Sequence, residues 1–367
     1  MYKRITTTAL LLALSAPAMS HHGFGRFDLR TDIQLEGELT GLDFVNPHSY
    51  VRFDVTQEDG TVIEMGCEMR AATVLRRSGW TPDLFVEGAR IVIDGHPHGD
   101  DPTSCYAETL TIGDEPTLER YQQLSETAAP IDREYRRPDG RINLAGDWAQ
   151  EQYLMASAPD GRGTLVPKSM VAAVEAGEMD ISDAPGSGWG ASPALYTTAG
   201  ETAAAALRDA PPESHPRIQC EITSILFDWV FDGPINRITQ TDTTLTMQYG
   251  RGLTRTIHLD MNLHPDDIEP SRAGHSVGYW EGDTLMIDTI GFEPGIIAGL
   301  VPHSERLHVL ERFTLDPESY ALHRVYTAED PSFLATQYQG EDTVFPADAE
   351  FAEDECRELA FEFTDGA

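Results

Sequence analysis

Between residues 33 and 113, apolar and polar positions alternate in short runs, which is the two-residue period of β-strands. In "SYVRFDVTQ" every second residue from Val51 to Val55 is apolar, and comparable runs follow in "TVIEMGCE", "ARIVIDGHP" and "SCYAETLTI". The run "MRAATVLRRSGW" differs, because Ala72, Leu75 and Trp80 recur on one side of a helix. With "IQLEGELTGLDF" in front, the order is three strands, a short helix and two strands. We therefore predict an OB-like barrel within residues 21–113.

A second group of strand patterns fills the chain after Cys220. Runs such as "NRITQTD", "TLTMQYG", "RTIHLDM", "TLMIDTI" and "HVLERFTLD" follow at short intervals, separated by turns of Gly, Asp or Pro. Regularly spaced antiparallel strands are typical of a sandwich or a closed barrel. Upstream, Gly146-Asp147-Trp148 matches the G-x-W that opens the first strand of lipocalins. We therefore predict a mainly β chain in which residues 143–367 form a lipocalin-like antiparallel β-barrel.

Two segments do not follow a strand period. Residues 114–142 become polar and charged, as in "DREYRRPDGR", and are predicted to be a linker. Residues 156–216 are rich in Ala, Gly, Pro and Ser, and we expect them to be inserted after the first barrel strand. Within this insertion, Pro167 to Gly177 and Thr198 to Arg208 have helical character. The insertion is therefore predicted to be partly helical.

Residues 1–20 have the composition of a secretory signal peptide. Lys3 and Arg4 precede the apolar run "ALLLAL", and the small-residue stretch "APAMS" follows it. We expect cleavage near Ser20 and export to the periplasm or the medium. No other run approaches the ~20 apolar residues that a membrane span needs, so no span is expected in the mature chain.

The charge of the chain argues against two classes of partner. The sequence has 26 basic and 61 acidic residues, a net charge of −35. Removing Lys3 and Arg4 with the signal leaves 24 basic residues against the same 61 acids, so the mature chain carries −37. Such a charge repels phosphate backbones and anionic lipid, which argues against nucleic acid or a membrane surface as a partner.

Four cysteines remain after export, and an oxidising compartment favours disulfides over reactive thiols. Four cysteines allow three pairings. Their distribution favours one bridge in each half of the chain, Cys67 with Cys105 and Cys220 with Cys356.

The chain also resembles known families in two places. "HHGFGRFD", "GLDFVNPHSYVRFDV" and "RRSGWTPDLFVEGARIVIDG" are similar to a family of uncharacterised secreted bacterial proteins, known only as a domain of unknown function. Its marks are a His-His-x-Phe start, Asn46-Pro47-His48, and Gly79-Trp80 before a turn with Gly88. "PDGRINLAGDW" and the region from "TIHLDMNLHPDD" to "PHSERLHVLERF" resemble the C-terminal part of proteins that often share this architecture. The resemblance implies the domain layout and export, and it implies no activity.

One candidate motif is a serine hydrolase signature, Gly274-His275-Ser276-Val277-Gly278. A nucleophile elbow needs a strand before the serine and a helix after it. Here "YWEGDTLMIDT" follows, which predicts a strand, a Gly-containing turn and a second strand. The hydrolase with Ser276 as nucleophile is therefore kept only as an alternative function.

Histidines in the first half suggest a second alternative, a periplasmic copper-binding protein. Cleavage after Ser20 would place a histidine at the new N-terminus, where its amine and ring can chelate copper with help from another imidazole. Simple capping and solvated turns compete with this interpretation. The candidate ligands are His21, His22, His48, His96 and His98.

The predicted second barrel contains a denser group of polar residues. The candidate catalytic residues are His275, Asp288, His303, His308 and Glu311. The candidate substrate-binding residues are His264, Trp280, Phe292 and Arg312. Strand alternation places Asp288 with Met286, His308 with Arg312, and Glu311 on the apolar face with Val309 and Phe313.

Two interpretations of this group remain open. In the structural one, Glu311 pairs with an arginine and Asp288 caps a turn. In the functional one, the groups line a cavity in which a neutral histidine takes a proton and a carboxylate orients it. "IGFEPGIIAGLVPHS" is expected to be a mobile loop over the barrel mouth.

The preferred hypothesis is an exported barrel that binds a small, largely apolar molecule and performs cofactor-free acid–base chemistry of the isomerase, lyase or cyclase type. The sequence lacks a P-loop, a dinucleotide glycine fingerprint, a C-x-x-C and an H-E-x-x-H motif. No cofactor is therefore expected apart from the copper of the alternative hypothesis.

Overall fold

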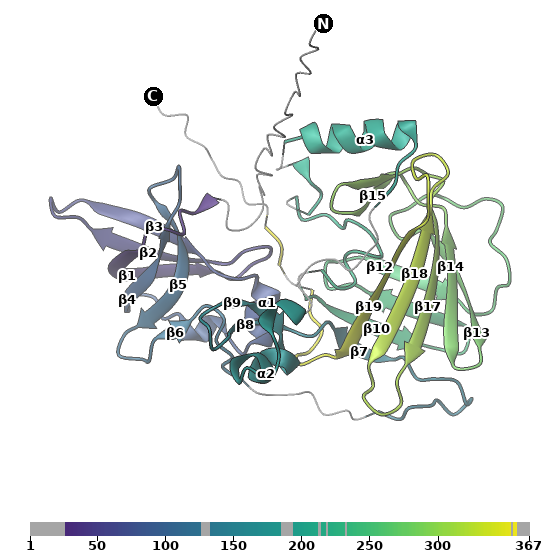
Figure 1. The fold of residues 1–367 in the computed structure, drawn as a ribbon, viewed down its shortest axis with the longest axis horizontal. Coiled ribbons are helices and arrows are strands. Elements are labelled where there is room, and N and C mark those ends of the chain that lie inside the picture. Colours follow the sequence, from purple (N-terminus) through teal and green to yellow (C-terminus); the bar gives the residue numbers. More distant parts are fainter. Residues whose placement is uncertain are drawn as a thin grey trace, which may run out of the picture.

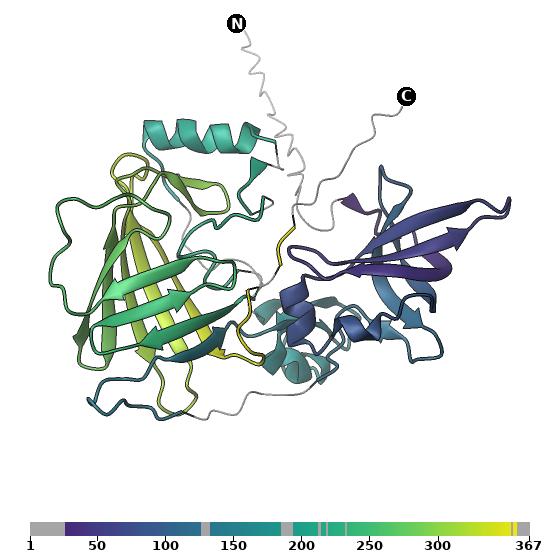
Figure 2. The same cartoon turned by 180° about the vertical axis from the view of Figure 1, so that it is seen from behind.

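The computed structural model describes residues 26–125, 133–184, 194–211, 214–217, 219–231, 233–353 and 355–357. Two closed β-barrels stand side by side, the first drawn in purple and blue and the second in green and yellow (Figure 1). The view from behind shows the same two units (Figure 2). The predicted mainly β fold class is confirmed.

The first barrel has the predicted OB-like order. Its elements are β1 (Ile33–Asp43), β2 (Tyr50–Thr56), β3 (Val62–Glu68), α1 (Ala72–Arg77), η2 (Pro82–Leu84), β4 (Arg90–Pro97), β5 (Ser104–Ile112) and β6 (Leu118–Glu119). The sheet runs β3-β2-β1-β4-β5-β6, and a parallel pairing of β3 with β5 closes it. Cys67 lies opposite Cys105 in that pairing and forms the predicted disulfide with it. The residues between β3 and β4 thus contain the one helix that the sequence pattern predicted there.

The second barrel is closed by nine strands in the order β10-β11-β12-β13-β14-β17-β18-β19-β7. These are β7 (Gly146–Ala149), β10 (Ile235–Gln240), β11 (Thr244–Gln248), β12 (Thr254–His258), β13 (His275–Glu281), β14 (Thr284–Ile290), β17 (His308–Leu315), β18 (Leu322–Glu329) and β19 (Tyr338–Pro346). All pairs are antiparallel except β12 with β13. That pair is parallel because residues 259–274 carry the chain back along the barrel before β13 begins.

A long excursion separates β7 from β10 and contains the predicted helices. Its elements are β8 (Tyr153–Ser157), β9 (Gly163–Pro167), η3 (Lys168–Met170), α2 (Val171–Glu175), η4 (Ile181–Asp183) and α3 (Thr198–Asp209). The β8–β9 hairpin and α2 share a small core of their own around Val166 and Val174. Helix α3 lies across one end of the second barrel (Figures 1 and 2).

The expected mobile loop over the barrel mouth is instead a hairpin. β15 (Gly295–Ala298) pairs with β16 (Val301–His303), and Ile296, Ile297 and Ala298 are buried. The segment forms strands because the Gly and Pro residues that suggested an irregular loop flank an apolar stretch, which is buried. Its mobility stays a prediction.

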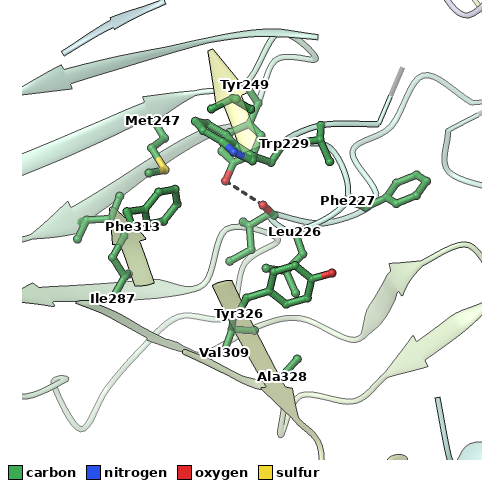
Figure 3. Close-up of a cluster of buried hydrophobic side chains, with 14 of the residues drawn as sticks. Leu226, Phe227, Trp229, Met247, Tyr249, Ile287, Val309, Phe313, Tyr326 and Ala328 are labelled. Atoms are coloured by element: carbon green, nitrogen blue, oxygen red, sulfur yellow. Dashed lines mark hydrogen bonds between the residues drawn. The ribbon is translucent and has the colours of Figure 1, made fainter. Parts of the chain in front are cut away.

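Residues 221–231 fill the interior of the second barrel; we call them the plug. Ile225, Leu226 and Trp229 of the plug are fully buried in the barrel core. Figure 3 shows Leu226 and Trp229 among barrel side chains such as Tyr249 and Phe313. Tyr249 Oη donates a hydrogen bond to the Ile225 carbonyl over 3.1 Å. The barrel interior is therefore packed with protein rather than left open as a wide ligand chamber.

The C-terminal tail connects the two barrels. Cys356 forms the predicted disulfide with Cys220, which precedes the plug. Asn46 of the first barrel donates its backbone N–H to the Glu355 carbonyl, and Arg357 donates its own to the Asn46 carbonyl. The second disulfide therefore anchors a segment that pairs with the first barrel.

Candidate functional site

Strands β13, β14 and β17 carry most of the predicted site residues, and their alternation divides these between two faces. Asp288 and His308 lie on the outer face of the barrel wall, partly exposed, whereas Glu311 points into the core with Val309 and Phe313. The predicted faces are therefore confirmed. The consequence is that the candidate residues form two separate groups.

The outer group, which we call the histidine cluster, consists of His258, His264, His275, Asp288 and His308. Asp288 Oδ1 lies 3.0 Å from His308 Nε2 and 3.1 Å from His264 Nε2. His264 Nδ1 lies 2.9 Å from His275 Nδ1. The side chains of His308 and Asp288 are 35% and 36% exposed, so a ligand can reach them from solvent.

Register and a loop bring these residues together. His275 begins β13 and pairs with Ile290 at the end of β14, two residues after Asp288. Asp288 itself pairs with Leu310 of β17, two residues after His308, which begins that strand. His264 comes from the 259–274 loop, which Ile268 anchors against Gly291. A Cβ at Gly291 would come within 2.4 Å of Ile268 Cγ2, so glycine permits this close approach.

The hydrogen bonds fix which ring nitrogens carry protons when the rings are neutral. A carboxylate only accepts, so His264 Nε2 and His308 Nε2 both donate to Asp288. His264 Nδ1 is then bare and accepts the proton of His275 Nδ1. This leaves His275 Nε2 without a proton. The cluster is therefore a continuous chain of hydrogen bonds with a proton acceptor at one end.

The pKa values of the two histidines at the ends of this chain are shifted in opposite directions. The hydrogen bond to Asp288 raises the pKa of His308 above its ordinary 6.5. Burial, together with the nearby rings of His258 and His264, lowers the pKa of His275 below 6.5. For Asp288, burial acts to raise the pKa, but the hydrogen bonds from His308 and His264 outweigh it and lower the pKa. Near pH 6.5 the carboxylate is ionised, His308 is the protonated ring and His275 the neutral one.

His258 belongs to the cluster, although the sequence analysis did not select it. Its ring stacks on that of His275, with centroids 5.0 Å apart and planes within 14°. The register of β12 against β13 produces this contact, pairing His258 with Val277 in parallel. The sequence would have indicated a place for His258 in the cluster only if it had shown that β12 and β13 are neighbours. No sequence pattern predicted that pairing.

The inner group is an ion network in which Glu311 is held by Arg255 and Arg324. Glu311 accepts from Arg255 Nη2 and, at 3.3 Å, from Arg324 Nη1. Arg324 also pairs with Asp342. Burial acts to lower the pKa of Arg255, but Glu311 outweighs it and the pKa is raised. Both oxygens of Glu311 are thus engaged, as the structural interpretation of this residue requires.

Ser276 is part of the same buried network. Its Oγ accepts from Arg255 Nε at 2.9 Å and contacts Thr289 Oγ1 at 2.9 Å. The residue lies within β13, is fully buried and is followed by the predicted hairpin into β14, whose turn contains Gly282 at φ 63°. The strand–turn–helix geometry of a nucleophile elbow is therefore missing around Ser276.

His303 and Phe292 belong to neither group, because they line a cavity at the barrel mouth. This cavity has a volume of about 130 Å³ and lies between the plug, the β15–β16 hairpin and the start of β17. Burial lowers the pKa of His303, so its ring is neutral at pH 7. Of the other predicted residues, Trp280 is half-buried at the barrel wall and Arg312 is exposed on β17.

The predicted copper ligands are only partly described. His21 and His22 lie outside the described residues. His48 Nδ1 lies 3.1 Å from Glu68 Oε1, His96 Nδ1 lies 3.0 Å from the Thr31 carbonyl, and His98 Nδ1 accepts backbone N–H groups of residues 100 and 101. Within the part of the chain that the structure describes, no three His, Cys, Asp or Glu side chains form a metal-binding group. Copper binding at the N-terminus stays a prediction.

The comparisons with known proteins give one match. Residues 9–106 match a family of unknown function (DUF6152), which covers most of the first barrel and none of the second. No curated protein and no solved structure matches the chain. Among the described residues, no helix has the length and apolar character needed to cross a membrane.

Proposed function

We propose that this protein is an exported acid–base enzyme of the isomerase or lyase type, and that the histidine cluster is its active site. One observation carries the proposal: a single hydrogen-bonded chain links a neutral histidine, His275, to a readily protonated one, His308, through His264 and Asp288. Two titratable groups whose pKa values are pushed apart are suited to act as base and acid in one reaction. The two disulfides support export to an oxidising compartment.

The proposed reaction is proton transfer on a small, largely apolar carbon acid. His275 Nε2 removes a proton from a carbon next to a carbonyl group, while protonated His308 donates to the carbonyl oxygen. The enol then returns its O–H proton to His308 and takes a proton on carbon from His275 Nε2, at the same carbon or, in a β,γ-unsaturated ketone, at the γ-carbon. Where the adjacent carbon bears a leaving group, the enol expels that group as its O–H proton returns to His308. The positive charge that His275 gains can pass through His264 towards Asp288. Asp288 therefore orients the rings of His264 and His308 and balances their positive charge.

Deuterium exchange tests this proposal without knowledge of the natural substrate. Small ketones such as cyclohexanone and acetone are incubated with the protein in D₂O, and NMR measures deuterium at the carbon next to the carbonyl. We expect His275→Gln and His308→Gln to slow catalysed exchange by about 10²–10⁴-fold, the usual contribution of a positioned acid or base. His323→Gln is the control, because His323 is exposed on β18, outside the cluster, with its Nδ1 2.8 Å from Thr343 Oγ1.

Exchange that is unchanged in both cluster variants would remove the cluster from the mechanism. Saturable ketone binding without exchange in the unmodified protein would show a binding protein instead of an enzyme.

The pH dependence provides a second test. Activity requires neutral His275, whose pKa lies below 6.5, and protonated His308, whose pKa lies above 6.5. The rate should therefore rise with pH as His275 loses its proton and fall as His308 does, with a maximum between the two pKa values. Asp288→Asn removes the hydrogen bond that raises the pKa of His308, so the falling limb should move to lower pH. A falling limb that stays in place would contradict the assignment of His308 as the acid.

A further inference from the structure

We infer that the cavity at the mouth of the second barrel is a separate binding site for a small single-ring alcohol or phenol, whose hydroxyl group donates a hydrogen bond to His303. The cavity is distinct from the histidine cluster because the two lie on opposite faces of the same wall. Val309 lines the cavity, whereas the preceding residue, His308, faces outward to the cluster.

The size and the walls of the cavity define the class of ligand. Its volume is about 130 Å³, close to the ~150 Å³ apolar cavity that holds a benzene molecule. The walls are mainly aliphatic and aromatic side chains: Ile222, Ile225, Leu226, Phe292, Ile296 and Leu307. The cavity therefore has room for a single ring.

The charged residues at the rim do not favour an ionic ligand. Arg272 lines the cavity but donates to Glu293 Oε1 at 3.0 Å, to Glu221 and to the Ile222 carbonyl at 2.8 Å. Glu293, which also lines the cavity, is the partner in the first of these bonds. Because Arg272 is already paired with two carboxylates, Glu293 and Glu221, a neutral molecule is a better match than an anion.

His303 offers a hydrogen-bond acceptor in this apolar setting. Its Nδ1 lies 3.0 Å from the Ser304 carbonyl, which can only accept, so Nδ1 carries the proton and Nε2 is bare. A Cβ built on Gly295 would lie 3.0 Å from Nε2, so glycine leaves the space in front of this nitrogen open. A ligand hydroxyl donating to Nε2 would occupy that space.

Thr223 supplies a second polar group. It lines the cavity, and its Oγ1 is buried without a hydrogen-bond partner among the described residues. Buried polar atoms are seldom left unpaired. A ligand oxygen that donates to His303 and accepts from Thr223 would satisfy both residues, which is what an alcohol or phenol can do and a hydrocarbon cannot.

The cavity is closed by elements that hold each other in place. Ser224 Oγ of the plug donates to the Ile297 carbonyl of the hairpin over 2.6 Å. The plug backbone is in turn held by Asp228 Oδ2, which accepts from the N–H groups of Thr223 and Ser224 at 2.6 and 2.8 Å. The site is therefore preorganised, which lowers the entropic cost of binding a small ligand.

Calorimetric titration of the full-length protein with phenol, anisole and benzene tests the inference. Phenol should bind about tenfold more tightly than anisole, which cannot donate to His303, and more tightly still than benzene, which can neither donate nor accept. His303→Leu should abolish the preference for phenol over anisole and still bind benzene. Gly295→Ala should weaken phenol binding with His303 retained, because the new methyl group crowds Nε2.

The controls separate this site from the proposed active site. His323→Gln should bind phenol like the unmodified protein, and so should His275→Gln, since the cluster lies outside the cavity. Equal affinity for phenol and benzene in the unmodified protein, or no saturable binding of either, would overturn the inference. If His303→Leu does not fold, the comparison of the three ligands and the Gly295→Ala variant decide.

Discussion

At the scale of single residues, Glu311 illustrates what alternation along a strand can and cannot predict. The pattern of β17 placed this carboxylate on the apolar face, and burial of a charge requires a partner. The partners themselves, Arg255 and Arg324, come from β12 and β18. Arg324 lies on the strand paired with β17, whereas Arg255 reaches Glu311 from β12, three strands away in the barrel order. The contact with Arg255 depends on closure of the barrel, which the sequence does not specify.

Replacing Glu311 with Gln should destabilise the protein by about 3–5 kcal/mol, since two buried guanidinium groups lose the carboxylate between them. Urea unfolding followed by circular dichroism measures the change. The matched control is Glu341→Gln, an exposed acid on β19, for which we expect less than about 0.5 kcal/mol. A similar small effect for Glu311 would show that the network adds little to stability.

In the histidine cluster, too, the residues could be selected from the sequence, but their contacts could not. His264, His275, Asp288 and His308 were all selected from the sequence by residue type and proximity along the chain. Their hydrogen bonds depend on the register of β14 against β13 and β17. We expected these residues to line one enclosed space with Glu311 and His303. In the structure they lie on the outer face of the barrel wall, whereas Glu311 and His303 lie on its inner side.

At the scale of elements, local sequence predicts hairpins well and the plug poorly. The turn at Gly282 and the strand patterns beside it correctly predicted the β13–β14 hairpin. The plug has no strand or helix period, so its apolar residues gave no indication of where they are buried. Its position inside the barrel is determined by the volume that the surrounding strands leave to be filled.

The packing of the plug predicts how much stability the protein loses when its largest side chain is removed. Trp229→Ala should destabilise the protein by about 3–5 kcal/mol, because a fully buried indole leaves a large cavity. Trp280→Ala, on the half-buried side of the wall, is the matched control and should cost clearly less. Thermal unfolding of both variants checks the difference. Equal losses would mean that residues 221–231 do not form the centre of the core.

At the scale of the whole molecule, the two barrels are joined by buried polar contacts. The Arg77 side chain, from α1 of the first barrel, is 4% exposed and pairs with Asp348, with Arg77 Nε 2.6 Å from Asp348 Oδ1. It also donates to the carbonyls of Gly233 at 2.9 Å and Gln150 at 2.7 Å, which lie next to strands of the second barrel. One side chain thus links three separate segments.

Arg77→Ala should therefore uncouple the barrels. We expect two separate transitions in differential scanning calorimetry, and one for the unmodified protein, because each barrel keeps its own core while the junction loses a buried ion pair. Arg52→Ala is the control, since Arg52 is exposed and its partner Asp43 lies within the first barrel. A single transition at the original temperature would contradict a role for Arg77 in the coupling.

The sequence by itself determined the mainly β class, the OB-like order of the first barrel, the helices of the insertion, the faces of β14 and β17, and both disulfide pairings. These follow from periods and turn residues that act within a few positions, and from the distribution of the cysteines along the chain. Only the tertiary structure decided that the plug fills the second barrel, that the 259–274 loop brings His264 to Asp288, and that His303 lines a cavity apart from them. The physical reason is that closure of a barrel sets neighbours between residues far apart in sequence, and no local pattern records which strands or loops will meet.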